Sequence, residues 1–187
     1  MNLRAKTTLG VCLLIGSAAL MQAASVGTVA PDVRVSVPST GAVLSTASMR
    51  GEIVLVQFLL TECSHCQQTA AMLSRLQAEF KGRGLKIVGA AIDDGPRTSA
   101  AIDLFRSANH VEFPVGYADR QQALGALDIP AGARFVVPQI LIIGRDGRVR
   151  AKSEPMGSPE LQDEESLRTL LGKLLYEKPQ VTQSRRR

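Results

Sequence analysis

Two cysteines, Cys63 and Cys66, lie where one hydrophobic pattern gives way to another. Residues 53–60 form a continuous apolar run rich in β-branched side chains, which predicts a buried strand. From Cys66 onward the apolar residues recur at helical spacing, with Ala70 and Leu73 on the same face. A Cys-X-X-Cys pair at such a strand-to-helix junction is typical of a redox-active dithiol.

The junction gives the two thiols different expected environments. Cys63 falls at the start of the predicted helix, where free N–H groups and the positive end of the helix dipole favour a thiolate, the nucleophilic form of cysteine. Cys66 continues the buried face, so we expect it to be shielded and to resolve a mixed disulfide. His65 adds a possible cation beside the thiolate. The alternative is a pair of buried, inert thiols.

The first 24 residues have the pattern of a secretory signal peptide. Arg4 and Lys6 precede an apolar run, and small residues follow it at Ala23 and Ala24. We therefore expect export to the periplasm or another extracytoplasmic compartment, with an uncleaved membrane anchor as the alternative. Cleavage would also remove Cys12, the third cysteine of the chain, and leave a single Cys pair in a compartment where disulfides persist.

The charge of the chain argues against nucleic-acid binding. The net charge is +5, from 22 Lys and Arg against 17 Asp and Glu. Two of the positive charges belong to the predicted signal peptide and three to Arg185, Arg186 and Arg187. No basic patch with interleaved aromatic residues is evident. We expect residues 179–187 to form a disordered basic tail. We also expect the protein to be a monomer.

The predicted elements alternate between strand and helix in the middle of the chain, which indicates an α/β fold with a parallel core. Strands are expected at 33–37, near a sheet edge, and at 53–60, 85–92, 113–117, 139–143 and 149–152, the last two joined as a hairpin. Four helices are expected. The first follows the cysteines, and the third covers 120–127. The second carries Ala101, Leu104, Phe105 and Ala108 on one face, and the last carries Leu167, Leu170, Leu171, Leu174 and Leu175 on one face. Residues 42–50 are ambiguous.

This order resembles the thioredoxin fold, and more closely the exported TlpA/ResA-type thiol–disulfide oxidoreductases within the AhpC/TSA and redoxin superfamily. The resemblance spans one domain, residues 30–178, and rests on segments 30–32, 51–58, 113–115 and 137–147. It implies a central mixed sheet flanked by helices, an N-terminal extension strand, and a strand and helix inserted over about 97–117. It implies protein thiols and disulfides as partners, with apocytochrome c or a membrane electron donor among the candidates. It implies no cofactor beyond a redox-active Cys63–Cys66 disulfide.

The resemblance also assigns roles around the Cys pair. It implies a cis peptide between Val137 and Pro138 that faces the sulfurs, although only about one X-Pro bond in twenty is cis. Pro138 would then belong to the catalytic group with Cys63, Cys66 and His65. Val137 would pair with a substrate strand, and Ser64 and Glu62 would line the same substrate site.

Three positions depart from the family pattern. Glu62 replaces the usual aromatic residue before the first cysteine, and the pair between the cysteines ends in His65 rather than proline. Gln57 stands at the buried strand position that is acidic in thioredoxin. Glu62 would disfavour a thiolate at Cys63, and a protonated His65 would favour it. His65, together with Val137 before the proline, is similar to DsbA-type oxidants and favours an oxidant or isomerase.

Two other functions use the same residues. A copper or zinc chaperone would bind metal through Cys63, Cys66 and perhaps His65, because thiolates suit these ions. The only other histidine, His110, is expected at the end of the inserted helix. A peroxiredoxin-like peroxidase would need proline at Gln57 and cysteine at Ser64. The Asp93-Asp94 pair suggests acid catalysis or metal binding, but a polar turn at a strand end is the simpler explanation.

Overall fold

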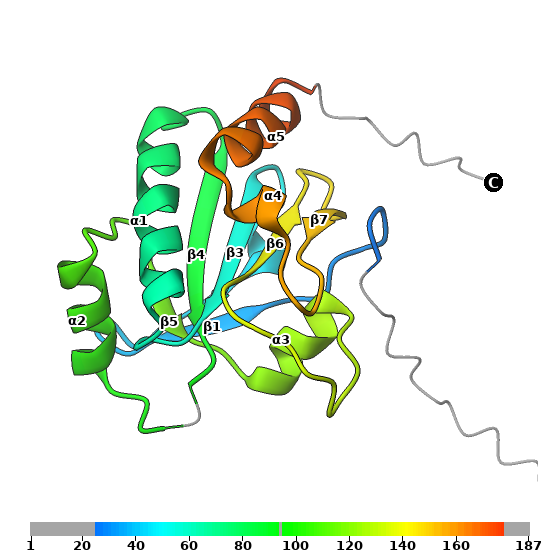
Figure 1. The fold of residues 1–187 in the computed structure, drawn as a ribbon. Helices are drawn as coiled ribbons and strands as arrows, with labels where there is room; N and C mark the ends of the chain where they lie inside the picture. Colours follow the sequence, from blue (N-terminus) through cyan, green and yellow to red (C-terminus); the bar gives the residue numbers. More distant parts are fainter. Residues whose placement is uncertain (1–24, 94, 178–187) are drawn as a thin grey trace, which may run out of the picture.

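The computed structural model describes residues 25–93 and 95–177, in which seven strands form one mixed sheet (Figure 1). The predicted signal peptide and basic tail lie outside the described residues. The order of the strands across the sheet is β2-β1-β5-β4-β3-β6-β7. In chain order they are β1 (Arg34–Val37), β2 (Ala42–Ser45), β3 (Ile53–Leu59), β4 (Leu85–Ala91), β5 (Val115–Tyr117), β6 (Gln139–Ile143) and β7 (Val149–Lys152).

Helices cover both faces of this sheet (Figure 1). They are the 3-10 helix η1 (Thr46–Met49) and the α-helices α1 (Ser64–Glu79), α2 (Ser99–Ala108), α3 (Arg120–Leu127), α4 (Pro159–Gln162) and α5 (Glu164–Tyr176). Buried side chains of α1, α2, α4 and α5 share one core cluster with one face of the sheet. Buried side chains of α3 share the second cluster with the other face.

The centre of the sheet is parallel, and its flanks are antiparallel. Strands β3, β4 and β5 run parallel, whereas β6 pairs antiparallel with β3 and β7 with β6. On the far side, β1 pairs antiparallel with both β5 and β2. This confirms the predicted thioredoxin-like fold, with α2 and β5 in the expected insertion and β1 as the N-terminal extension strand.

Strand β3 is buried along its whole length because helices cover both of its faces. Leu55 and Leu59 point into the α1 cluster, and Val56 and Phe58 point into the α3 cluster. A strand covered on both sides has no polar alternation, which is why residues 53–60 read as a continuous apolar run. The residues that follow β3, including the cysteines, therefore lie at the C-terminal end of an interior strand of the sheet.

Close approach of two strands explains the glycine in β5. A Cβ atom at Gly116 would lie 2.2 Å from the carbonyl oxygen of Ser36 on β1. Any larger residue would push β1 away from β5, so Gly116 allows the extension strand to join the sheet.

Several local predictions were wrong or incomplete. Leu104 is 69% exposed and Ala108 is also exposed, while Ile102 and Phe105 form the buried stripe of α2. The sequence could not place the stripe because α2 carries apolar residues on more than one side. Strand β1 lies one position inside the edge, since the ambiguous segment forms the outer strand β2 and then η1. The short helix α4 was not anticipated.

Over residues 25–93 and 95–177, no helix has the length and apolar character that a membrane crossing requires.

Candidate active site

The sulfur of Cys63 lies at the mouth of α1. Cys63 is the N-cap residue, with extended backbone angles of φ −81° and ψ 115°, and its Sγ accepts a hydrogen bond from the Cys66 N–H at 3.2 Å. It is only partly buried. N-terminal amides of a helix have no carbonyl partner within the helix, so a sulfur in the N-cap position can be stabilised as a thiolate by them. The structure confirms that Cys63 stands at the accessible start of the helix.

The sulfur of Cys66 is enclosed one turn further along. Cys66 is fully buried and belongs to the core cluster formed with α1 and the sheet. Burial raises the pKa of its thiol, and its contact with Cys63 and the charge of Asp93 raise it further, while a hydrogen bond from the Leu60 backbone opposes them. Both thiols are free in this structure. The motif therefore holds one accessible sulfur and one protonated, shielded sulfur beside it.

A loop from a distant part of the chain faces the accessible sulfur. The Val137–Pro138 peptide is cis, as the resemblance implied. The carbonyl oxygen of Val137 lies 4.0 Å from Cys63 Sγ, within the range of a weak contact from the thiol. Pro138 is buried and Val137 is half-buried. The structure thus brings together Cys63, Cys66, Val137 and Pro138.

Two glutamines that sequence reasoning missed hold this loop in place. Gln139 is fully buried, and its Nε2 donates to the carbonyl oxygens of Val136, Glu154 and Pro155 at 2.7, 3.2 and 3.2 Å. Gln162 Nε2 reaches the Pro138 carbonyl oxygen at 3.5 Å. The only sequence signal for Gln139 was a polar residue beside an apolar run, which is also common in surface turns, and Gln162 lies in a polar stretch that gave no signal.

Gln57 lies behind the motif on β3. Its Nε2 donates to the Cys66 carbonyl oxygen at 2.8 Å, so it ties the first turn of α1 to the sheet. The other side-chain atom, Oε1, is buried and has no hydrogen-bond partner within residues 25–93 and 95–177. Unpaired buried polar atoms are uncommon in native proteins, and this one lies close to the cysteines.

The Asp93 side chain fixes the loop between β3 and α1. Its Oδ1 accepts hydrogen bonds from the backbone N–H of Thr61 at 3.0 Å and from the Thr61 hydroxyl at 2.9 Å. The prediction that Asp93 lies in a polar turn at the end of a strand is therefore confirmed. Its neighbour Asp94 lies outside the described residues.

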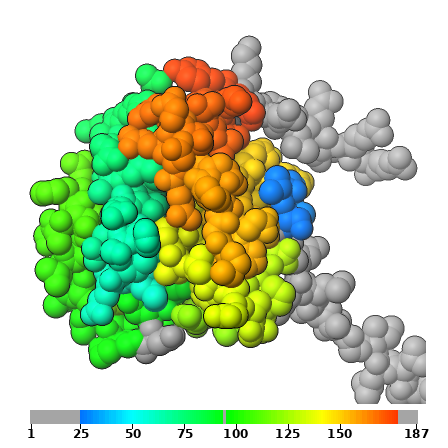
Figure 2. Space-filling model, in the orientation of Figure 1, coloured from blue at the N-terminus to red at the C-terminus, as the bar shows by residue number. Residues whose placement is uncertain are grey.

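The remaining predicted residues surround the motif at the surface. Glu62, Ser64 and His65 are all exposed. His65 lines a hollow of about 340 Å³ between α1 and the α4–α5 junction, together with Arg75 and Asp163 among others. In the space-filling view, the first turns of α1 border the yellow and orange residues of the segment before β6 and of α4 (Figure 2). The start of α1 thus lies beside two segments that are distant from it in sequence.

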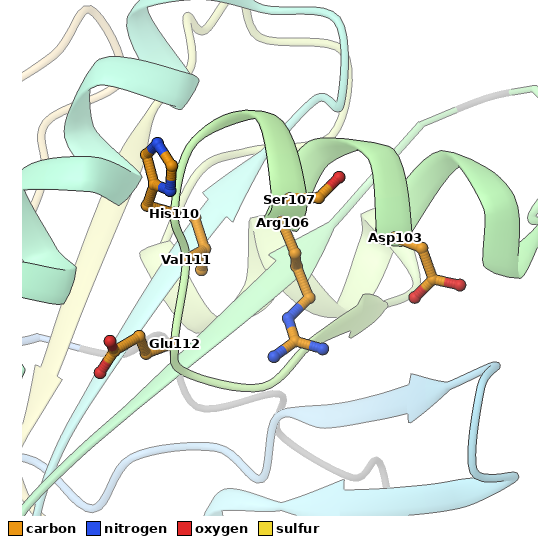
Figure 3. Close-up of a pocket in the computed structure, with 6 residues that line it drawn as sticks. All are labelled: Asp103, Arg106, Ser107, His110, Val111 and Glu112. Carbon is orange, nitrogen blue, oxygen red and sulfur yellow. The ribbon is translucent and has the colours of Figure 1, made fainter.

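The other histidine lies elsewhere. His110 follows α2 with a left-handed φ of 52° and lines a hollow of about 400 Å³ with Arg106 and Glu112 (Figure 3). The Glu112 N–H lies 3.4 Å from Ser74 Oγ, about two turns beyond Cys66 on α1. Among the residues that the structure describes, no three His, Cys, Asp or Glu side chains are grouped closely enough to hold a metal ion.

Comparison with known proteins agrees with this arrangement. Residues 26–152 match the model of the AhpC/TSA family. No curated protein sequence is significantly similar to this chain.

Solved structures share the fold at low sequence identity. A Chlorobium tepidum protein assigned as the thiol:disulfide interchange protein DsbE is 23% identical, with a TM-score of 0.65 over 82% of this chain and 99% of that one. The thioredoxin domain of a Bacteroides vulgatus thiol-disulfide oxidoreductase is 19% identical, with a TM-score of 0.62 over 81% and 98%. A secreted Mycobacterium tuberculosis disulfide oxidoreductase is 18% identical, with a TM-score of 0.56 over 75% and 95%. At these identities the likeness establishes the fold.

Proposed function

This chain belongs to the AhpC/TSA family, and we propose that it is a thiol–disulfide oxidoreductase that exchanges electrons with other proteins through Cys63 and Cys66. The observation that carries the proposal is the asymmetry of the two sulfurs. Cys63 Sγ is accessible and accepts a helix N–H, whereas Cys66 is fully buried beside it. One sulfur can meet a partner while the other waits out of reach of solvent.

The reaction follows from that asymmetry. The Cys63 thiolate attacks a partner disulfide, forms a mixed disulfide and releases one partner thiolate. The Cys66 thiolate then attacks Cys63 Sγ, which forms the Cys63–Cys66 disulfide and releases the second partner thiolate. Two electrons pass to the partner, and the reverse sequence oxidises a partner dithiol. Neither direction requires a cofactor beyond the cysteine pair.

The partner is proposed to bind along the loop before β6 as an extended segment. The Val137 carbonyl oxygen faces Cys63, so a backbone N–H of the partner can bond there. Val136 and Met156 are 40% and 68% exposed, and the Val136 side chain lies close to Gly157, so these apolar groups border one surface. Exposed apolar side chains beside a reactive sulfur suit a partially unfolded protein. Ser64, Glu62 and His65 would line the other side.

The proposed setting is extracytoplasmic. Residues 1–24 would act as a signal peptide, or as an anchor if uncleaved, and residues 30–178 would form the working domain. Structural neighbours include a protein described as secreted and one assigned as DsbE. Apocytochrome c and a membrane electron donor are the candidate partners to test first.

The proposed direction is that of an oxidant or isomerase, from His65 and Val137. Equilibration of the Cys63–Cys66 pair with glutathione measures its reduction potential, which decides the direction. A potential near about −120 mV supports an oxidant, and one near about −270 mV would assign the chain as a reductant instead.

Two cysteine variants test the activity itself. Cys63→Ser should abolish turnover of a disulfide substrate, and Cys66→Ala should accumulate a mixed disulfide that is visible on a non-reducing gel and released by dithiothreitol. Ser107→Ala, at an exposed position of α2 away from the cysteines, serves as the control and should retain the activity. Wild-type turnover in both cysteine variants would rule out this function.

A further inference from the structure

Strand β4 is longer than its neighbour β5, so part of its edge has no partner strand. It pairs with β3 along its whole length, from Leu85 to Ala91, but with β5 only from Gly89 to Ala91. Its first half, residues 85–88, lies at the end of the sheet where α1 ends (Figure 1). A strand edge without a partner offers a row of backbone hydrogen-bonding groups to another chain.

Two residues of this half direct their backbone groups toward the missing strand. Gly89 faces β5, because its N–H donates to the Pro114 carbonyl oxygen at 2.9 Å. Every second residue of a strand directs its N–H and C=O to the same side, so Leu85 and Ile87 face that side too. The pairing ends at Gly89 because Pro114 has no N–H that could reach the Ile87 carbonyl oxygen.

These backbone groups are buried and unpaired. Ile87 is 2% exposed and Leu85 is 8% exposed. Within residues 25–93 and 95–177, the N–H and C=O of both residues have no hydrogen-bond partner. Buried backbone groups in native proteins are nearly always paired. The open stretch therefore has the groups that a further strand would need.

A hollow of about 410 Å³ lies along this edge of β4. Leu85 and Ile87 line it from the strand, and the half-buried side chains of Leu44 and Met49 line it from β2 and η1. An extended segment in the hollow would pair its backbone with β4 and bury apolar side chains against Leu44 and Met49. Because the edge is recessed, a single extended segment suits it better than the broad sheet of a folded domain.

The charge of the hollow indicates what such a segment carries. Lys81 and Lys86 line it and are exposed, and none of the described residues lining it is acidic. Neither lysine has an ion pair within the part of the chain that the structure describes. Lys86 shares the sheet face of Val88 and Ala90, whereas Lys81 follows α1 on the opposite face. A cation therefore stands on each face of the open edge.

We propose that the open edge of β4 is a docking site for an extended segment of another protein, with apolar side chains between acidic ones. The segment adds a strand beside Leu85 and Ile87, and its acidic residues meet Lys81 and Lys86. The site lies at the opposite end of β4 from the cysteines. It would hold a partner while Cys63 stays free to react.

Charge argues against two other occupants. Residues 178–187 of this chain carry Lys178, Arg185, Arg186 and Arg187 and no acidic residue, so the lysines of the hollow would repel them. A second copy paired edge to edge through the same site would bring the lysines of both copies together. An acidic segment of a different protein has neither cost.

Fluorescence anisotropy with the full-length protein and a panel of labelled hexapeptides tests the site. Each peptide has Glu at both ends, which fall on opposite faces of a strand, and its inner positions carry combinations of Val, Leu, Phe and Thr. Members of the panel should bind, and the same peptides with Lys at both ends should bind about tenfold more weakly. A panel without a binder, or without dependence on the end charges, overturns the proposal.

A charge reversal locates the lysine contact. In Lys86→Glu, the preference for Glu ends over Lys ends should fall about fivefold. Lys173→Glu makes the same charge change at an exposed position of α5 and is the matched control, so its preference should match wild type. An equal effect of both variants would show that only net charge is sensed and would overturn the proposal.

Methylation of the peptide nitrogens tests backbone pairing. The best peptide is made in two forms, each methylated at alternate nitrogens, and at least one form should bind about tenfold more weakly. Wild-type binding of both forms would exclude an added strand. In isotope-labelled protein, the peptide should shift the amide resonances of Leu85 and Ile87 most. Largest shifts around Cys63 and Val137 would place the peptide at the proposed substrate site and overturn the proposal.

The other occupants would be visible without any peptide. An Ile87 amide resonance that moves on dilution would assign the edge to a second copy. One that moves when Arg185, Arg186 and Arg187 are all replaced by Glu would assign it to residues 178–187. Either result overturns the proposal. Cys63→Ser should bind the peptides as wild type does, so the docking site stands or fails independently of the proposed activity.

Discussion

The end of the sheet that carries the cysteines differs from the opposite end in how its polar groups are paired. We call the first the motif end (residues 57, 60–66, 93 and 136–139) and the second the distal end (residues 50–52, 82–84 and 144–148). At the distal end, Arg145 donates to the carbonyl oxygens of Gly51, Arg83 and Leu175 at 2.9, 3.2 and 3.2 Å. One side chain thereby joins three separate segments.

Unpaired polar atoms gather instead at the motif end. Of the four buried unpaired side-chain atoms found over residues 25–93 and 95–177, three belong to Gln57, Asp93 and Gln139. Gln57 and Gln139 lie on neighbouring strands, where Phe58 pairs with Gln139 in the register of β3 and β6. The fourth belongs to Arg106 on α2.

The two ends of the sheet thus differ in how completely their polar side chains are hydrogen-bonded. The side-chain donors of Arg145 are paired at the distal end, whereas three buried acceptor oxygens near the sulfurs are not. Two variants and one change of pH test this contrast.

The largest effect is expected for Arg145→Ala. Loss of three charge-assisted hydrogen bonds at a partly exposed site should lower the free energy of unfolding by about 2–3 kcal/mol in urea denaturation. Turnover of a disulfide substrate should stay at the wild-type rate, because the motif end is untouched. Arg145→Lys keeps the charge but not the planar fork and should recover only part of the loss. Slower turnover in Arg145→Ala would contradict the separation of the two ends.

An intermediate effect is expected from pH at the motif end. The pKa of the Cys66 thiol is raised above its ordinary value of 9.0, chiefly by burial. The folded protein thus keeps a proton that the unfolded chain loses, so stability is complete below about pH 9 and falls above it, by up to about 1.4 kcal/mol per pH unit.

Urea unfolding between pH 8 and 10.5 measures this loss. The pKa of Tyr117 is also raised, chiefly by burial, but it contributes equally in every form. Reduced wild type should therefore lose more stability than reduced Cys66→Ala over this range. Equal losses in the two proteins would contradict the buried, protonated state of Cys66.

The smallest effect is expected for Asp146→Asn at the distal end. Burial opposes ionisation of Asp146, but the Arg148 N–H at 3.1 Å and the Arg150 guanidinium at 2.9 Å hold its pKa below the usual range. A lowered pKa stabilises the fold above the unfolded value of about 3.9 and loses that stability as pH falls. We expect a loss of about 0.5–1 kcal/mol at pH 7 in urea unfolding that shrinks towards pH 3. A difference constant with pH would count against the ion pair.

Much of the fold follows from local patterns in the sequence. The unbroken apolar run of β3, the turn at Gly147 and the leucine face of α5 each predict one element, because burial and turn conformation are set by nearby residues. The buried stripe of α2 was not predictable in the same way. Leu104 and Phe105 are equally apolar, and only packing against the sheet decides which of them is covered.

The site divides along the same line. The sequence by itself determined that Cys63 begins a helix and that Cys66 lies inside its buried face, since both follow from the change of period at the end of β3. Only the tertiary structure decided that Asp93 accepts hydrogen bonds from Thr61 in the loop before α1 and that Gln139 and Gln162 hold the loop around Pro138. Those neighbours come from strand register and loop packing between segments far apart in the chain, and no local pattern encodes such distances.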